Sequence, residues 1–206
     1  MMCVVSFSGW LENESVWLHM SYKFMLELLR GHLYDAFFLE ISQGLVPFMD
    51  NKRFGRSPLE AASFIVSSAF PDPKLHGAGF LARLSGSTAE FMSMWTIMTQ
   101  GHQPFVVDEN GEVNLHLRPI LARWMFFKDG TLSFTFLGST KVVYHNPHML
   151  DTWNLSPTSY EIVLSHNKKD GSSNTLVQKV QGEFTGNELA ILIREQKVKS
   201  IDVYLG

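Results

Sequence analysis

LHGAGFLARLSGSTAEFMSMWTIMTQG, residues 75–101, places a loop rich in glycine and serine directly before an apolar helix. The quartet SGST at 85–88 offers hydroxyls and backbone N–H groups at the positive end of that helix, an arrangement suited to phosphate. The alternative is that Ser85 or Ser87 only caps the helix, with Glu90 completing a capping box. The stretch alone leaves both interpretations open, so the rest of the chain has to decide.

Size and composition are those of an ordinary globular protein. The chain has 206 residues, 45% hydrophobic and 18% charged, with a formal net charge of −3, enough for one large or two small domains. This charge gives no electrostatic case for a nucleic acid or an anionic membrane as partner. The single Cys3 excludes an internal disulfide, and no Cys/His spacing is typical of a zinc site. The first ten residues are too short for a signal or membrane segment, and we expect a cytoplasmic protein.

Two hydrophobic periodicities divide the chain. Apolar residues three to four apart in 21–101 predict helices, among them 59–69 and 87–100, the latter with Met94 and Trp95 on its apolar face. After Gly101 alternation predicts short strands, with a hairpin turn at 128–130 and a surface loop at 168–174. The strands are expected at 113–117, 132–136, 141–144, 160–164, 176–180 and 201–205, with one short helix at 188–195.

The fold class expected from this pattern is α+β. A helical domain over residues 1–104 would be followed by an antiparallel β-sandwich over 105–206, with the boundary within about residues 101–111. Four helices with so much apolar surface are not expected to close a core alone, so they would belong to a larger helical array. An open edge would expose the apolar faces around 37–38 and 94–95 and favour association with another chain.

The order of several short motifs along the chain resembles a known family. They are Glu12-Asn13, His19, a helical hairpin, the loop at 51–57, Ser85-Gly86 before a helix ending at Gly101, Leu115, Arg118-Pro119, Trp124 and Tyr144-His145-Asn146-Pro147. This order, over about residues 7–205, resembles the C-terminal quarter of the family 94 glycoside phosphorylases, the cellobiose phosphorylase group. It is also similar to the related β-1,3-glucan phosphorylases.

The resemblance implies a fold and a reaction. The fold would be the last helices of an (α/α)6 barrel followed by a C-terminal β-sandwich. In the reaction, inorganic phosphate attacks the anomeric carbon of a β-glucoside or β-glucan oligosaccharide with inversion and releases α-glucose 1-phosphate. Phosphate is then the co-substrate, and no metal or organic cofactor is needed. Such an enzyme requires one carboxylic acid for the leaving oxygen and a donor-rich phosphate pocket, not the two carboxylates of an inverting glycosidase.

The family's site residues fall on few positions of this sequence. The resemblance implies that Glu12 binds sugar hydroxyls and that His19 donates to phosphate. Ser85 and Gly86 would complete the phosphate cradle with a hydroxyl and backbone N–H groups. Without the family, His19 would be an ordinary packed histidine, and Glu12 would be a solvated loop acid or an N-cap partner through Asn13.

The sequence departs from the family pattern around this site. Glu14-Ser15 stands where the family has two glycines, Leu11 replaces a common lysine, and Glu90 replaces the tryptophan of cellobiose phosphorylases. These changes favour a different β-glucan, or a longer donor, over cellobiose. Trp10 and Trp17, near Glu12, are the tryptophans considered for a sugar contact.

The family's general acid and its phosphate-binding arginine lie upstream of the Glu12 segment, where this sequence has no counterpart. We therefore expect a C-terminal fragment of a phosphorylase without a catalytic residue of its own, forming a homodimer or associating with the missing barrel part. The alternatives are a non-catalytic carbohydrate-binding or structural module, and a related glycoside hydrolase. Turnover that depends on inorganic phosphate separates these classes.

Several other residues are secondary candidates. Arg83 could assist at phosphate, and Arg53 and Arg56 form a basic loop that could face a glucan. Trp95 is expected in the core, and Trp124 at the start of a strand between packed layers. His145 and His148 bracket a turn without a third ligand nearby, so no metal is expected there.

Overall fold

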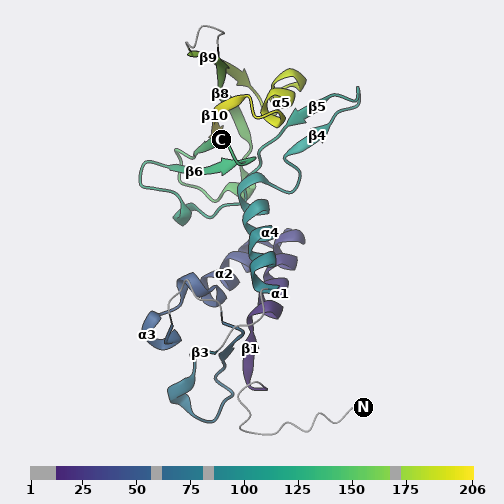
Figure 1. Ribbon diagram of the computed structural model, residues 1–206. Coiled ribbons are helices and arrows are strands. Elements are labelled where there is room, and N and C mark those ends of the chain that lie inside the picture. The colour runs from purple at the N-terminus through teal and green to yellow at the C-terminus, as the bar shows by residue number, and fades with distance from the viewer. Residues whose placement is uncertain (1–12, 57–61, 81–85, 168–172) are drawn as a thin grey trace. The chain divides into compact units, whose positions relative to one another are not determined.

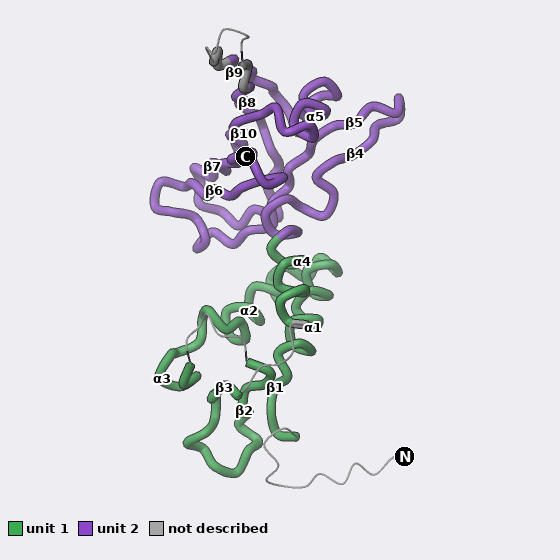
Figure 2. The backbone as a smooth tube through the Cα atoms, in the orientation of Figure 1, with its two compact units in different colours: residues 1–95 green, residues 96–206 purple. Residues whose placement is uncertain are grey.

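The computed structural model describes residues 13–56, 62–80, 86–167 and 173–206 (Figure 1). The chain divides into two compact units, residues 1–95 (unit 1) and residues 96–206 (unit 2), which are coloured separately in Figure 2. Helices and mainly antiparallel strands occur together, which confirms the mixed α and β class. None of the helices in these ranges is long and apolar enough to cross a membrane.

Unit 1 combines helices with a small sheet. Its three antiparallel strands pair in the order β1-β2-β3. The elements are β1 (Ser15–Trp17), α1 (Leu18–Arg30), α2 (Tyr34–Gly44), α3 (Asn51–Phe54), β2 (Phe64–Val66), β3 (Gly79–Phe80) and the first ten residues of α4 (Gly86–Gln100). Helices α1 and α2 form a hairpin whose buried side chains include Met25, Leu29 and Phe37. At the contact a Cβ on Gly44 would lie 2.7 Å from Cε of Met25, so a larger residue there would require the end of the Met25 side chain to move.

The helix predicted at 59–69 is wrong where the structure describes it. Phe64–Val66 is a strand, buried at all three residues, that lies between β1 and β3. Residues 57–61, the expected start of the helix, lie outside the described residues. A short apolar run rich in aromatic and β-branched residues fits a buried strand as well as a helix, and periodicity cannot separate the two.

The apolar faces expected to be open are mostly closed. Phe37, Phe38 and Met94 are buried, whereas Trp95, expected in the core, is 40% exposed. Other apolar side chains of unit 1 face outward instead, namely Val16, Met20, Phe24, Leu33, Leu39, Phe48 and Met92. The helix predicted at 87–100 is confirmed as α4, with its start one residue earlier.

Unit 2 is built on a five-stranded sheet with the order β6-β7-β10-β8-β9. Three neighbouring pairs are antiparallel, whereas β10 pairs with β7 in parallel, which the sequence did not predict. A two-stranded β4-β5 ladder and helix α5 complete the unit. The elements are β4 (Phe105–Val107), β5 (Val113–Leu115), β6 (Thr131–Phe136), β7 (Thr140–His145), β8 (Pro157–Asn167), β9 (Ser173–Gln181), α5 (Asn187–Arg194) and β10 (Val198–Leu205).

The core of unit 2 lies on one face of this sheet. Alternate residues of the strands β6, β7, β8 and β10 are buried, such as Val142 and Tyr144 on β7 and Ile201 and Val203 on β10, whereas Leu176 and Val177 on β9 are exposed. Buried apolar residues of α5 and of the segment 115–122 complete this core; they are Leu115, Leu117, Ile120, Leu121, Ala122, Leu189, Ala190 and Ile193. The alternation therefore produces the half-buried strands that period two predicts.

Two local predictions in unit 2 need correction. The turn at 128–130 precedes β6, but β6 forms its hairpin with β7 across 137–139 rather than across this turn. Trp124 lies in a 3-10 turn, Arg123–Met125, and is 51% exposed, so it neither starts a strand nor packs between layers. The predicted loop at 168–174 falls largely outside the described residues.

Candidate phosphate-binding site

The structure describes two of the four predicted site residues. Glu12 and Ser85 lie outside the described residues, as do Arg83 and Trp10. His19 is the second residue of α1, and Gly86 is the first residue of α4. Both described positions are therefore in the first turn of a helix, where backbone N–H groups lack intrahelical acceptors and the helix dipole favours an anion.

A row of aromatic rings positions the start of α1. Trp17, the last residue of β1, pairs with Phe64 on β2, which pairs with Phe80 on β3. The ring centroids are 5.2 Å apart for Trp17 and Phe64, and 5.7 Å for the stacked Phe64 and Phe80. The N–H of Leu18 donates to the carbonyl of Ser63 at 3.0 Å. The small sheet thus fixes where α1 begins.

His19 is held against this row and has an unsatisfied nitrogen. Its ring meets the Trp17 ring edge-on, with centroids 5.7 Å apart. Its Nδ1 atom is buried and has no hydrogen-bond partner among the described residues. A buried polar atom without a partner is costly, so a bound group that accepts or donates a hydrogen bond there would stabilise the site. The first turn of α1 contains no acidic residue to compete for it.

The contacts of Trp17 bear on its proposed role at a sugar. One indole contacts Phe64 and also the edge of His19. These contacts show that Trp17 packs between Phe64 and His19, and they favour a structural role for Trp17 over a contact with a sugar.

The start of α4 removes one alternative for the serine-rich loop. Ser87 is buried and already helical, so it does not occupy the capping position, and a capping box between Ser87 and Glu90 is wrong. A cap formed by Ser85 lies outside the described residues. Anion binding at the first turn of α4 therefore stays a prediction.

Two carboxylates that sequence reasoning did not assign share the property of His19. One side-chain oxygen each of Glu14 and Glu90 is buried without a hydrogen-bond partner among the described residues. Glu14 precedes β1, and its main-chain carbonyl accepts from Ser67 N at 3.1 Å and from Ser67 Oγ at 2.9 Å. Such oxygens suit a ligand that donates, such as a sugar hydroxyl, and disfavour direct contact with a phosphate dianion. In the sequence, both residues depart from the family pattern, and Glu90 was otherwise considered only for a capping box.

The basic loop is tied to its own unit. Arg53 donates from Nε to the carbonyl of His76 at 3.1 Å, and Arg56 from Nε to the carbonyl of Gly79 at 2.9 Å. Arg56 also lines an open depression of about 840 Å³ between α3 and β3. These bonds give both arginines a structural role, because Arg53 joins α3 to the segment before β3 and Arg56, after α3, bonds to the first residue of β3.

Neither a metal site nor a known relative identifies the function of this site. Within the described ranges, no group of three or more His, Cys, Asp or Glu side chains is placed to hold a metal ion. His145 instead contacts Asp202, with Nε2 and Oδ1 2.7 Å apart. The chain matches no protein-family model, and a comparison with curated proteins gives no match either.

Proposed function

We propose that this chain forms the phosphate-binding wall of an inverting β-glucoside or β-glucan phosphorylase. The observation that carries the proposal is the buried, unpartnered Nδ1 of His19 in the first turn of α1. When this nitrogen bears a proton it can donate to a phosphate oxygen, and the helix dipole adds to the attraction. Ser85 and Gly86 at the start of α4 would supply the remaining donors.

In this reaction a phosphate oxygen attacks the anomeric carbon while the bond to the leaving sugar oxygen breaks and that oxygen takes a proton. The products are α-glucose 1-phosphate and a saccharide shortened by one unit. His19, Ser85 and Gly86 would orient the phosphate, and Glu12 would accept from sugar hydroxyls. Glu14 and Glu90 offer further buried acceptors for such hydroxyls. None of these residues is assigned as the proton donor, which the proposal places outside this sequence.

The proposal includes the family's architecture and setting. Helices α1, α2 and α4 would be the last helices of an (α/α)6 barrel, and unit 2 the C-terminal β-sandwich of a cytoplasmic enzyme. Outward-facing Met20 and Phe24, one turn apart on α1 and 57% and 54% exposed, support a further apolar partner on this helix. That partner would be the rest of the barrel or a second copy of the chain.

Phosphate binding tests the proposal directly. Calorimetric titration of the chain with inorganic phosphate at low salt should show saturable binding, and His19→Ala and Ser85→Ala should each abolish it. His32→Ala is the matched control, because His32 lies in the same unit, in the turn after α1, and contacts the hydroxyl of Tyr34. Absence of binding by a folded chain, or equal binding by the His19→Ala variant, would contradict the proposal.

Turnover distinguishes the alternatives once the general acid is supplied. Release of sugar from a β-glucan only in the presence of phosphate identifies a phosphorylase, whereas release in water alone identifies a hydrolase. A chain that binds saccharide but supports neither reaction belongs to the class of non-catalytic modules.

A further inference from the structure

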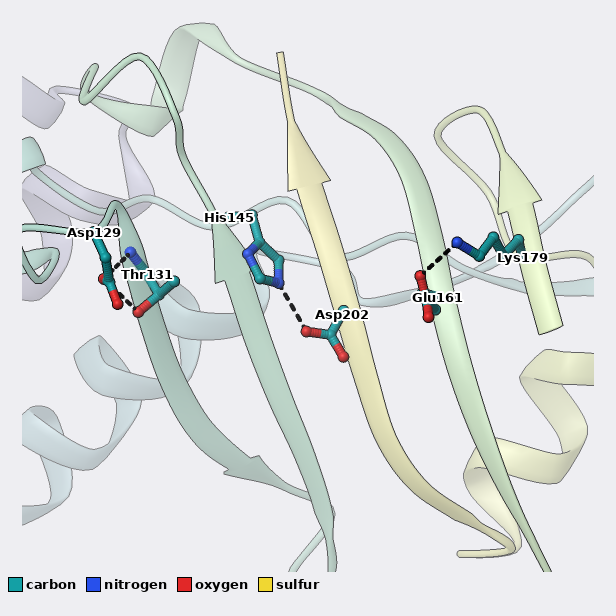
Figure 3. Close-up of polar contacts among 6 residues, drawn as sticks. All are labelled: Asp129, Thr131, His145, Glu161, Lys179 and Asp202. Atoms are coloured by element: carbon teal, nitrogen blue, oxygen red, sulfur yellow. Dashed lines mark hydrogen bonds and ion pairs between the residues drawn. The ribbon is translucent and has the colours of Figure 1, made fainter. Parts of the chain in front are cut away.

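The outward face of the five-stranded sheet in unit 2 carries an ordered set of polar and aromatic side chains. On β10, Asp202 and Tyr204 point away from the core, while Val203 between them is fully buried. Figure 3 shows Asp202 beside His145 of β7 and Glu161 of β8 beside Lys179 of β9. In the ladder, Tyr204 lies opposite His145 on one side and Ser159 on the other.

The ring of Tyr204 is held in place on this face by His145. Its ring stacks on the His145 ring, with centroids 4.5 Å apart and planes 12° from parallel. His145 is itself held by its Nε2, 2.7 Å from Oδ1 of Asp202. Because β7 and β8 flank β10 on opposite sides, His145 covers the β7 side of the Tyr204 ring. The other side of the ring faces β8 and β9, and Tyr204 remains 37% exposed.

A shallow depression borders that open side. It has a volume of about 200 Å³ and is lined by Ser159, Tyr160, Glu161, Lys179, Gln181 and Tyr204. Its polar groups include a hydroxyl, an amide, a carboxylate and an ammonium, so donors and acceptors converge on a small volume beside one aromatic ring. Few convergent polar groups around an apolar surface are typical of a ligand site.

Two ion pairs lie on this face close to the depression. Nζ of Lys179 lies 3.0 Å from Oε2 of Glu161, and this contact raises the pKa of the Lys179 ammonium. Asp202 is similarly occupied by His145. An ionic ligand would find no unpaired opposite charge among these groups, whereas hydroxyl groups can bond to a carboxylate and an ammonium that neutralise each other. The charge pattern therefore favours a neutral, hydroxyl-rich ligand.

We propose that the depression beside Tyr204 binds one sugar unit of a neutral oligosaccharide, with the C–H face of the sugar on the Tyr204 ring. Glu161, Lys179 and Gln181 would bond its hydroxyls. This site belongs to unit 2 and is separate from His19 and Gly86 in unit 1. It does not require phosphorolysis, and it gives the sheet the role of holding a saccharide chain.

The test is a titration of the full chain with cellopentaose, laminaripentaose and maltopentaose, in which the NMR shifts of the backbone amides are monitored. We expect at least one of the three to shift amides of 159–161, 179–181 and 202–204 in a saturable way. Tyr204→Ala should weaken this binding about tenfold, and Gln181→Ala about fivefold. Tyr204→Phe keeps the ring and should bind within about twofold of the wild type. Thr135→Ala is the control on the same sheet, because Thr135 is an exposed residue of β6 away from the depression.

Three results would overturn the proposal. The first is the absence of shifts with all three pentasaccharides at about 10 mM, where millimolar ligands occupy most of their sites. The second is binding that Tyr204→Ala leaves unchanged in a variant with a folded spectrum. The third is an equal response of the same amides to inorganic phosphate, which would contradict the charge argument. Because the titration reports on unit 2, its failure is distinguishable from loss of phosphate binding by His19→Ala.

Discussion

Replacement of Tyr144 by phenylalanine isolates one buried hydrogen bond in unit 2. Tyr144 is fully buried on β7, and its hydroxyl donates to the carbonyl of Thr99 at 2.6 Å. Thr99 is in the last turn of α4, where carbonyls have no intrahelical donor. Gly101 then ends the helix at a φ of +85°, where a Cβ would lie 2.6 Å from the carbonyl of Arg118. The Tyr144 hydroxyl therefore supplies a side-chain donor to the last turn of α4, beside the main-chain donors of Gly101 and Ile120.

The expected cost follows from what the substitution leaves behind. Tyr144→Phe keeps the ring, so the transfer of apolar surface is nearly unchanged. It leaves the Thr99 carbonyl buried without this donor, a change that costs about 1–3 kcal/mol. For a chain of this length, each 1 kcal/mol corresponds to about 2–4 °C in Tm. The variant should thus melt about 2–12 °C below the wild type.

Urea unfolding followed by far-ultraviolet circular dichroism measures this cost. The midpoint should fall while the m-value stays constant, because the area exposed on unfolding does not change. Tyr204→Phe is the matched control, since it removes a hydroxyl from the outward face of the same sheet and should change stability by less than about 0.5 kcal/mol. Equal stability of the Tyr144→Phe variant and this control would refute the role assigned to the Thr99 contact.

Three further predictions concern pH, packing and association. Burial raises the folded-state pKa of Tyr144 and of Tyr160 above the unfolded value of about 10. The stability that these two tyrosines contribute is therefore complete below about pH 10 and is lost as the pH rises further. Urea midpoints measured between about pH 8 and 11 should fall over this range, and Tyr160→Phe should make the fall smaller. Gly79→Ala places a Cβ 2.2 Å from Cε2 of Phe54 and should destabilise unit 1 by about 1–3 kcal/mol, with Phe54→Leu partly restoring stability in a double-mutant cycle. Phe24→Gln should weaken association of the chain in sedimentation velocity, and unchanged association would place the interface elsewhere.

The period-two pattern of unit 2 was sufficient to locate most of its strands. Predicted strands at 132–136, 141–144, 160–164, 176–180 and 201–205 and the helix at 188–195 are confirmed. One face of this sheet is buried, so alternation is a direct record of which side each residue takes. The parallel pairing of β10 with β7 was not predictable in this way, because it joins strands more than fifty residues apart and leaves no local signal.

Unit 1 was predicted less well because its strands are short. β1, β2 and β3 have three, three and two residues, too few to show a period, and β2 is buried throughout. The pattern around Phe64 was therefore assigned to a helix. The local sequence does not show that Phe64 pairs with Trp17 and Phe80 on the neighbouring strands, and this pairing gives each ring an aromatic partner.

The same pairing determines the environment of His19, which the sequence did not predict. A histidine after a tryptophan near a helix start was visible in the sequence, and the resemblance assigned it to phosphate. That its Nδ1 is buried without a described partner depends on β1 running directly into α1, and on Trp17 being held by Phe64. Replacing Phe64 would then disturb His19 without removing any residue that is predicted to bind phosphate. The small sheet thus positions His19, the candidate phosphate-binding residue of unit 1.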